Sequence, residues 1–591
     1  IRTWTRREKD EWWLKNVYRG DMAQLTLRSA LTGFLLGGVL AATGLYIAAK
    51  TGISIGVGLT SVILAFAIYR ILHGAGMAQD FTILENNCTQ SIATAAGYVV
   101  TPLTSSLAAY MLITGIIIPW WQMMIWMVVI SIIGVLIAFP MKRRFINDEQ
   151  MPFPEGRASG VVLDSLYHGA AGAGMFKARL LGYTAVGTGL YQALVSDGWM
   201  KLIQFKILRL DQWAGLKEPW VFHERLDTYY YQAGGAALKI LNTDVRALGL
   251  RLTLDAAMLG VGGLMGIVVA TSCLLGAFVN FAVLAPIMIE RGDIVQRVLD
   301  NGQVVPISRA EIVNQWSMWW GVTMMVAGSL VGLLAKPDIF TSAFKGLKRG
   351  RGGQAAPAGD DPLKHIELPL WMSWVGVPVF SLLGAWVTHV FFGVPMLLAL
   401  ASLPLIFVLT VICTNSMALT SWTPTGSLSK ITQFTMGAID RTNPASNLLP
   451  AGMTGEIAAN AANLLSDIKP GYMLGGKPRH QAVGHVIGLF AGVMACVPLY
   501  FLLFLPADAS GVRTTTHMVS EQFAFPGAIQ WKGVAEIIAK GFGGLPASAL
   551  IAMGVAALAA VLIEVARMAT KNRFPLSSVS IGLGVVLPPE S

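Results

Sequence analysis

Charged side chains are scarce in this chain, and that scarcity sets its class. Lys, Arg, Asp and Glu make up 13% of the 591 residues, whereas about 25% is usual for a soluble domain. Hydrophobic residues make up 54% of the chain, and they recur in segments of about 20 residues, long enough to cross a bilayer as a helix. The alternating strands of about ten residues that mark a transmembrane β-barrel are absent. We therefore predict an all-α polytopic membrane protein.

Cysteine and histidine are also too sparse to indicate a metal centre. The four cysteines lie far apart in the sequence, which is neither a disulfide framework nor a zinc-binding knuckle. Among the eight histidines, only His480 and His485 form a close pair, and their spacing does not place both on one helical face. We expect no resident metal ion.

Motifs of nucleotide-driven and nucleic-acid-binding proteins are missing as well. The chain has no Gly-x-x-x-x-Gly-Lys-Ser/Thr motif, so we expect no ATP hydrolysis and no cofactor, and an ion gradient as the energy source. The formal net charge of +10 fits basic cytoplasmic loops better than a nucleic-acid groove. A membrane enzyme acting on lipid would need a clustered acidic motif or a His-rich loop, and Asp360 and Asp361 stand alone.

The order of apolar and polar segments predicts four parts of the chain. Residues 1–25 are basic and aromatic, without the apolar core of a signal peptide, and are expected at the cytoplasmic face of the membrane. Membrane halves are predicted at 26–335 and 368–591, joined by a linker at 336–367 that is rich in Gly and basic residues. The second half ends abruptly, so we expect a last span to be missing. The pattern of residues 196–251 is mixed and aromatic, and it predicts no role for this segment.

One stretch, Gly455–Arg479, combines polar residues with membrane-like surroundings. Written as a helix, it has polar residues at positions i, i+4, i+7 and i+11, which form one face. These are Glu456, Asn460, Asn463 and Asp467. Pro470 and Gly471 are expected to end the helix. Two plainer interpretations stay open, namely a soluble amphipathic helix and a role of Glu456 as a helix cap.

Two further polar segments interrupt the first half. The segment Glu85–Thr94 carries polar side chains on one helical face, including Asn87 and Gln90. A full crossing here would put the next basic cluster outside the cell, so we expect a re-entrant or broken helix. The second segment opens at Pro154, and Glu155 suits the first turn of a helix, where a carboxylate also has a plain capping role.

The second half repeats this order. A hairpin of apolar spans is followed by a polar stretch at 414–437 and then by the helix that carries Glu456. The polar stretch contains Asn415, Thr425 and Gln433. Duplicated halves with paired discontinuous helices are typical of transporters whose site lies near the middle of the membrane.

These residues resemble a known family over most of the chain. The motif Phe153-Pro154-Glu155-Gly156, and the run Asp467-Ile468-Lys469-Pro470-Gly471-Tyr472 followed by Pro478-Arg479, are similar to the oligopeptide transporter superfamily, which includes yellow-stripe-like metal-chelate transporters. The resemblance implies a proton-coupled importer with two related halves, a central substrate path and about 14 to 16 membrane helices. Its substrates would be short peptides, glutathione-like peptides or metal complexes of siderophores or nicotianamine.

The polar residues and the resemblance together give a set of candidate roles. A carboxylate enclosed in a membrane cavity is costly to keep charged, so it can take up and release a proton. The candidates for proton coupling are Glu456 first, then Glu85, Glu155 and Asp467. The candidates for binding substrate are Asn87, Gln90, Asn415, Thr425, Gln433, Asn460, Asn463 and Tyr472. A passive channel and a polytopic membrane enzyme remain the alternatives.

The expected partners follow from the same interpretation. They are the lipid bilayer and a small peptide or metal-chelate substrate, with no nucleic acid. We expect a plasma-membrane or inner-membrane protein with a cytoplasmic N-terminus. A homo-oligomer stays open.

Overall fold

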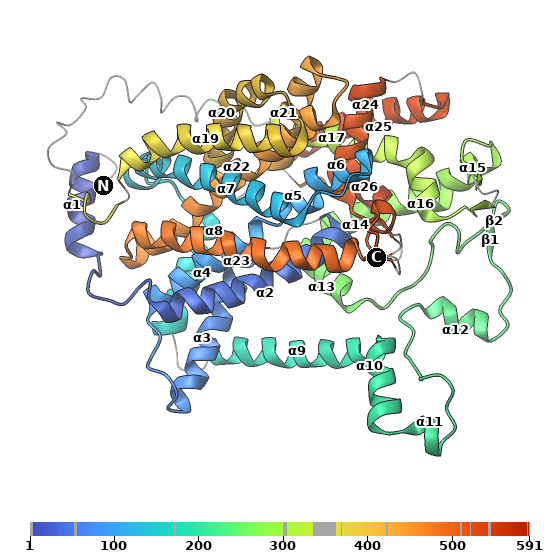
Figure 1. Cartoon of the computed structure of the whole chain (residues 1–591), viewed down its shortest axis with the longest axis horizontal. Coiled ribbons are helices and arrows are strands. Elements are labelled where there is room, and N and C mark those ends of the chain that lie inside the picture. The colour runs from blue at the N-terminus through green and yellow to red at the C-terminus, as the bar shows by residue number, and fades with distance from the viewer. Residues whose placement is uncertain are drawn as a thin grey trace. The chain divides into compact units, whose positions relative to one another are not determined.

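The computed structural model of the chain is dominated by helices (Figure 1). It describes residues 4–52, 56–168, 173–298, 304–305, 307–334, 362–367, 369–420, 423–508, 511–520, 522–541, 545–571, 573–587 and 589. Residues 336–361 of the predicted linker at 336–367 lie outside the described residues. The chain divides into two compact units, Ile1–Ala171 with Ser329–Gly544 (unit 1) and Gly172–Gly328 with Leu545–Ser591 (unit 2). The division into two related membrane halves stays a prediction.

Unit 1 consists mainly of long helices. They are α1 (Arg6–Asn16), α2 (Leu27–Thr51), α3 (Gly58–Gly74), α4 (Ile83–Tyr98), α5 (Thr101–Thr104), α6 (Ser106–Thr114), α7 (Trp120–Lys142), η1 (Arg143–Asp148), α8 (Pro154–His168), α19 (Leu370–Phe392), α20 (Met396–Thr420), α21 (Thr425–Ile439), α22 (Pro444–Leu474), α23 (Pro478–Phe504), η5 (Thr515–His517) and α24 (Pro526–Lys540).

Unit 2 combines helices with two short antiparallel hairpins. Its helices are α9 (Ala173–Val195), α10 (Asp197–Lys201), η2 (Leu202–Ile207), α11 (Leu210–Trp213), α12 (Leu226–Gln232), α13 (Ala256–Met265), α14 (Ile267–Ala277), η3 (Phe278–Leu284), α15 (Ala285–Glu290), α16 (Arg309–Ile312), η4 (Val313–Ser317), α25 (Ala547–Ala569) and α26 (Ser578–Val586), with α17 (Met318–Leu334) crossing the unit boundary in the sequence. Strand β1 (Lys239–Ile240) pairs with β2 (Thr243–Asp244), and β3 (Arg297–Val298) pairs with β4 (Val304–Val305).

Eight of the described helical segments are long and apolar enough to cross a membrane. They are Leu27–Thr51, Ile83–Thr114, Trp120–Asp148, Ile267–Glu290, Leu370–Phe392, Met396–Ala418, Pro478–Phe504 and Ala547–Ala569. The prediction of an all-α polytopic membrane protein is thereby confirmed. A total of about 14 to 16 membrane helices would also need shorter or more polar helices, such as α3 and α22.

Helix α22 forms the core of unit 1. Of its residues from Ala445 to Leu474, all except Met473 are buried, because α20, α21, α7, α8 and α4 pack around it. The interpretation as a soluble amphipathic helix is wrong, since the polar face is buried along with the apolar one. The capping interpretation of Glu456 is wrong as well, because the helix begins at Pro444 and places Glu456 near its middle.

The helix also continues through the proline that was expected to end it. Pro470 lies inside α22, which ends only at Leu474, before Gly475 at a φ of +84°. Pro470 has no N–H to donate to the carbonyl of Ser466. Gly156 of α8 lies so close to that carbonyl oxygen that a Cβ at position 156 would overlap it. The backbone of α8 therefore packs directly over the freed carbonyl.

The polar segment Glu85–Thr94 lies within one continuous helix, α4, so the helix is not broken inside this segment. The helical path breaks after it, where α4 is followed by α5 and α6, and Ser105 has a φ of −128° and a ψ of −96°. A re-entrant path for this segment stays a prediction. Thr82 and Glu85 form a capping box that begins α4. The first part, α4, packs against α2 and α23, and its polar side chains are buried.

Helix α1, within the predicted interfacial segment, is held against the end of α22. The Trp13 indole donates a hydrogen bond to the Tyr472 carbonyl at 2.6 Å, and the two rings stack with centroids 5.0 Å apart. The Lys9 ammonium donates to the Asp148 carbonyl at 2.6 Å. Burial raises the pKa of Asp10, which accepts a 2.7 Å hydrogen bond from Asn147. The N-terminal helix is thus anchored to the bundle.

The close contact between α4 and α23 gives a test of the packing. A Cβ at Gly488 would overlap the carbonyl oxygen of Ile92 and lie 2.8 Å from the Cβ of Ala95. We expect Gly488→Leu to lower stability by about 1–3 kcal/mol through overpacking, measured as a lower thermal midpoint in detergent. The matched control is Gly44→Leu, since no atom lies within 4 Å of a Cβ at Gly44. Equal midpoints for the two variants would contradict this packing.

Candidate functional site

The four polar residues predicted on one face of α22 are all buried. Glu456 is 1% exposed and Asp467 is 4% exposed, and Asn460 and Asn463 are buried with them. Buried polar groups are costly unless they find hydrogen-bond partners. The partners of this face therefore define the candidate site.

Glu456 is bound through only one of its two carboxylate oxygens. Its Oε1 accepts hydrogen bonds from the Ser131 hydroxyl of α7 and from the Asn460 side-chain amide, each at 2.8 Å. Its Oε2 is buried with no hydrogen-bond partner. In the described part of the chain, no basic side chain forms an ion pair with Glu456. Gly134 of α7 allows α7 to pack this closely against α22, because a Cβ at position 134 would lie 2.9 Å from the Asn460 Cβ.

A histidine of α23 connects the two carboxylates of α22. The Nε2 of His485 lies 3.3 Å from the Oδ1 of Asn460, and its Nδ1 lies 3.7 Å from the Oδ2 of Asp467. The His485 side chain is fully buried. This role of His485 was not predicted from the sequence, because the histidines were considered only as metal ligands. The sequence did contain a signal for such a role, since His485 is an isolated ionisable residue inside an apolar span.

Asp467 also lines a small polar cavity of about 10 Å³, room for roughly one water molecule. The cavity joins residues from helices that are distant in the sequence. Its lining consists of Gly58, Gln90, Thr94, Tyr98, Glu155, Gly156, Ser159, Met417, Asn463, Ser466 and Asp467. Four of the predicted site residues therefore meet here, namely Gln90, Glu155, Asn463 and Asp467. Glu155 remains exposed and forms the rim of the cavity.

Asn87 extends this polar region along α4. Its Nδ2 donates to the Oε1 of Gln90 at 3.4 Å, and its Oδ1 accepts from the Gln481 amide of α23 at 2.5 Å. Because Gln90 lines the cavity, Asn87 lies one contact away from it. Amide side chains from α4, α22 and α23 thus lie in the cavity lining or one contact away from it.

A second polar cluster surrounds Gln433 of α21. Its amide donates to the Trp531 carbonyl at 3.1 Å and to the Asn447 Oδ1 at 3.3 Å. Its Oε1 accepts from the Lys430 ammonium at 2.9 Å, and that ammonium lies 4.1 Å from the centre of the Trp531 ring. Lys430 is 1% exposed, and the described residues offer it no carboxylate in an ion pair. Lys430 was not among the residues predicted from the sequence.

The remaining predicted residues lie away from the cavity. Glu85 forms an ion pair with Arg28 at 2.6 Å and accepts from the Thr26 hydroxyl at 2.6 Å, contacts that hold α2 against α4. The Tyr472 hydroxyl accepts from the Gln150 amide at 3.1 Å, while its ring faces Trp13. Asn415 is buried in α20, and Thr425 lies in the first turn of α21. None of these residues lines the cavity.

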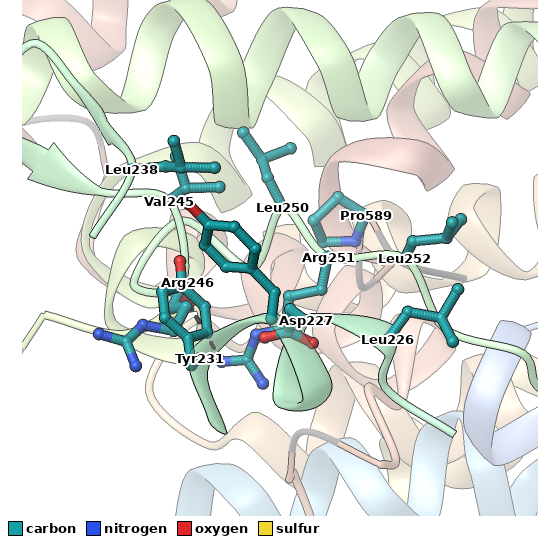
Figure 2. Close-up of a pocket in the computed structure, with 11 residues that line it drawn as sticks. Leu226, Asp227, Tyr231, Leu238, Val245, Arg246, Leu250, Arg251, Leu252 and Pro589 are labelled. Atoms are coloured by element: carbon teal, nitrogen blue, oxygen red, sulfur yellow. Dashed lines mark hydrogen bonds between the residues drawn. The ribbon is translucent and has the colours of Figure 1, made fainter. Parts of the chain in front are cut away.

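Unit 2 has a pocket of its own, of about 450 Å³. Figure 2 shows its lining, which comes mostly from the segment 196–251 that the sequence left unassigned. The guanidinium of Arg246 lies 4.1 Å from the centre of the Tyr231 ring and forms a 3.0 Å ion pair with Asp244. This pocket has the volume of a small-molecule site, but none of the predicted site residues lines it. We therefore regard the α22 cluster as the candidate site.

The described part of the structure contains no preformed metal-binding site. No group of three or more His, Cys, Asp or Glu side chains able to hold an ion occurs there. The four cysteines are free, and three of them are buried. The chemistry available at the α22 cluster is hydrogen bonding and proton exchange.

Comparisons with known proteins point to one family. The family model described as OPT oligopeptide transporter protein matches residues 24–591. A Haemophilus influenzae protein named as an oligopeptide transporter is 22% identical, over 92% of this chain and 83% of its own length. An Oryza sativa protein named as a metal-nicotianamine transporter is 22% identical over 93% of this chain and 81% of its own length. A metal-nicotianamine transporter of Arabidopsis thaliana is 23% identical over 88% of this chain and 79% of its own length.

The contacts of Glu85 predict that its main effect is on stability. Removing one partner of a buried ion pair costs about 3–5 kcal/mol. Because the Arg28 side chain is 31% exposed, we expect Glu85→Gln to cost less, about 2–3 kcal/mol. Thermal unfolding should show this loss, while uptake per folded molecule is retained.

The matched control is Glu149→Gln, which breaks the more exposed Arg144–Glu149 pair and should cost less than about 1 kcal/mol. A stable Glu85→Gln protein that no longer transports would instead return Glu85 to the proton-coupling candidates.

Proposed function

This chain belongs to the oligopeptide transporter family, and on that premise we propose that it is a proton-coupled secondary transporter importing short peptides or metal chelates. Family membership makes it an integral membrane transporter and not an enzyme. The proposal of proton coupling rests on a single observation, the environment of Glu456.

Neither protonation state of Glu456 is fully satisfied by its surroundings. A charged carboxylate would lie in a buried site with two neutral donors on one oxygen and none on the other. A neutral carboxyl group protonated on Oε1 could donate to the Ser131 oxygen, but Oε2 would still have no partner. Both states are therefore incompletely hydrogen-bonded, and a buried group of this kind is sensitive to small changes in its surroundings. Such a group suits a site that must alternately hold and release a proton.

The cavity supports a substrate with peptide-like groups. Gln90 and Asn463 offer neutral donors and acceptors, which match the amides and carboxylates of a peptide or a zwitterionic chelate. Its volume of about 10 Å³ is far below the roughly 300–1,000 Å³ of ligand pockets. We propose that this structure represents an occluded state, and that α22 separates from α4 and α8 to admit substrate. This separation would be the alternating-access step of transport.

The rest of the proposal concerns energy and orientation. Transport would use the proton gradient without a resident cofactor, and a metal ion would cross only inside its chelator. The basic, aromatic N-terminal segment would lie in the cytoplasm, below a plasma or inner membrane. Homo-oligomerisation stays open.

Reconstitution tests the proposal directly. Proteoliposomes with an inward acid gradient should accumulate either a pool of tri- to hexapeptides or ferric and nickel chelates, and an uncoupler should abolish the accumulation. Glu456→Gln should reduce gradient-driven accumulation to the uncoupled level, because the variant cannot bind the coupling proton. Substrate exchange across the membrane without a gradient should persist in the variant. Glu536→Gln, which affects a partly exposed pair with Lys532 on α24, is the matched control.

Each alternative predicts a different result. Dissipation of the proton gradient with no accumulation of either cargo would favour a passive channel. Full accumulation by Glu456→Gln would mean that this carboxyl group is structural. In that case Asp467 and Glu155 would be the next carboxylates to replace.

A further inference from the structure

The orientation of the Asn460 side chain fixes which atoms of His485 carry hydrogen. The Asn460 Nδ2 donates to the Glu456 carbonyl at 2.9 Å and to the Glu456 Oε1 at 2.8 Å. Turning the amide over would lose both hydrogen bonds, so its Oδ1 faces the His485 Nε2. An amide oxygen only accepts hydrogen bonds. The Nε2 of His485 therefore carries the hydrogen.

The other ring nitrogen then faces a carboxylate oxygen. The His485 Nδ1 and the Asp467 Oδ2 lie 3.7 Å apart, and neither has a hydrogen-bond partner. Without a proton between them, a nitrogen lone pair would face an anionic oxygen in a buried site, which is repulsive. One proton removes this repulsion, whether it is on Asp467 with a neutral ring or on His485 beside a carboxylate.

We infer that Asp467 and His485 together hold one proton, forming a second proton site beside the one proposed at Glu456. The inference deepens the proposed function, because it rests on proton coupling and adds where a proton is held next to the substrate cavity. Asp467 lines that cavity, while Glu456 is reached from it only through His485 and Asn460. The pair therefore lies closer to the substrate cavity than Glu456 does.

The surrounding charges agree with a shared proton. On the packed helices, the titratable groups near the pair are Glu456 of α22, Glu155 of α8 and Tyr98 of α4. The Arg28 of α2 is engaged by Glu85, α7 offers the neutral Ser131, and Lys469 donates to the Met151 carbonyl. With one proton the pair is neutral overall, which avoids a second negative charge beside Glu155.

The proton moves by a simple balanced step. A hydronium ion that reaches the cavity transfers a proton to the Asp467 carboxylate and leaves as water, and the new O–H donates to the His485 Nδ1. Release reverses this step and leaves one negative charge on the cavity wall. Substrate binding to the lining amides would therefore depend on whether the pair is protonated.

Infrared titration of the substrate-free protein in liposomes tests the inference without transport. The wild type should show a carboxyl group that loses its proton with pH, and Asp467→Asn should abolish that signal. His485→Gln keeps a polar side chain but removes the ring nitrogen, and should shift the midpoint of the signal by about one pH unit or more. The matched control is His480→Gln, since His480 is on the same helix but outside this network.

The outcomes separate this inference from the proposed function. An Asp467 signal that does not respond to His485→Gln, or no such signal at all, would overturn the shared proton. A signal that depends on His485 in a protein that shows no gradient-driven uptake would support the pair and refute proton coupling. If His485→Gln fails to fold, wild-type protein with isotope-labelled histidine gives the same test, because imidazole signals must change together with the carboxyl signal.

Discussion

Glu456, Asn460, His485 and Asp467 are buried, and most of their polar groups must find partners inside the protein. This requirement places a hydroxyl of α7 and an imidazole of α23 against one face of α22. Several polar atoms nevertheless remain without partners, including the Glu456 Oε2 and the His485 Nδ1. Those atoms are the places where a proton can be added without displacing an existing hydrogen bond.

Close backbone contact makes this arrangement possible. Gly134 of α7 and Gly156 of α8 approach α22 at positions where a Cβ would overlap its carbonyl oxygens. Lipid provides no hydrophobic drive between helices, so such close contacts supply much of the packing energy in a membrane. The small residues therefore both stabilise the bundle and bring the polar partners within reach.

The sequence predicted the local parts of the site and missed the contacts between distant segments. The spacing from Glu456 to Asp467 identified one polar face because helical geometry is local. The same reasoning placed the end of the helix at Pro470, since it did not include the neighbouring Gly156 that covers the freed carbonyl. It also could not pair Glu85 with Arg28, or Asp467 with His485, because these contacts depend on how helices pack. Lys430 was overlooked because an isolated lysine has no pattern of its own.

The stacking of Trp13 on Tyr472 has a mechanical consequence. Tyr472 lies in the last turn of α22, and Trp13 is bound to it by both its ring and its indole N–H. Any tilt of α22 must either carry helix α1 along or break this contact. The N-terminal helix α1 is therefore mechanically coupled to the helix that bears Glu456 and Asp467. A displacement of α1 would therefore be transmitted to α22 through this one contact.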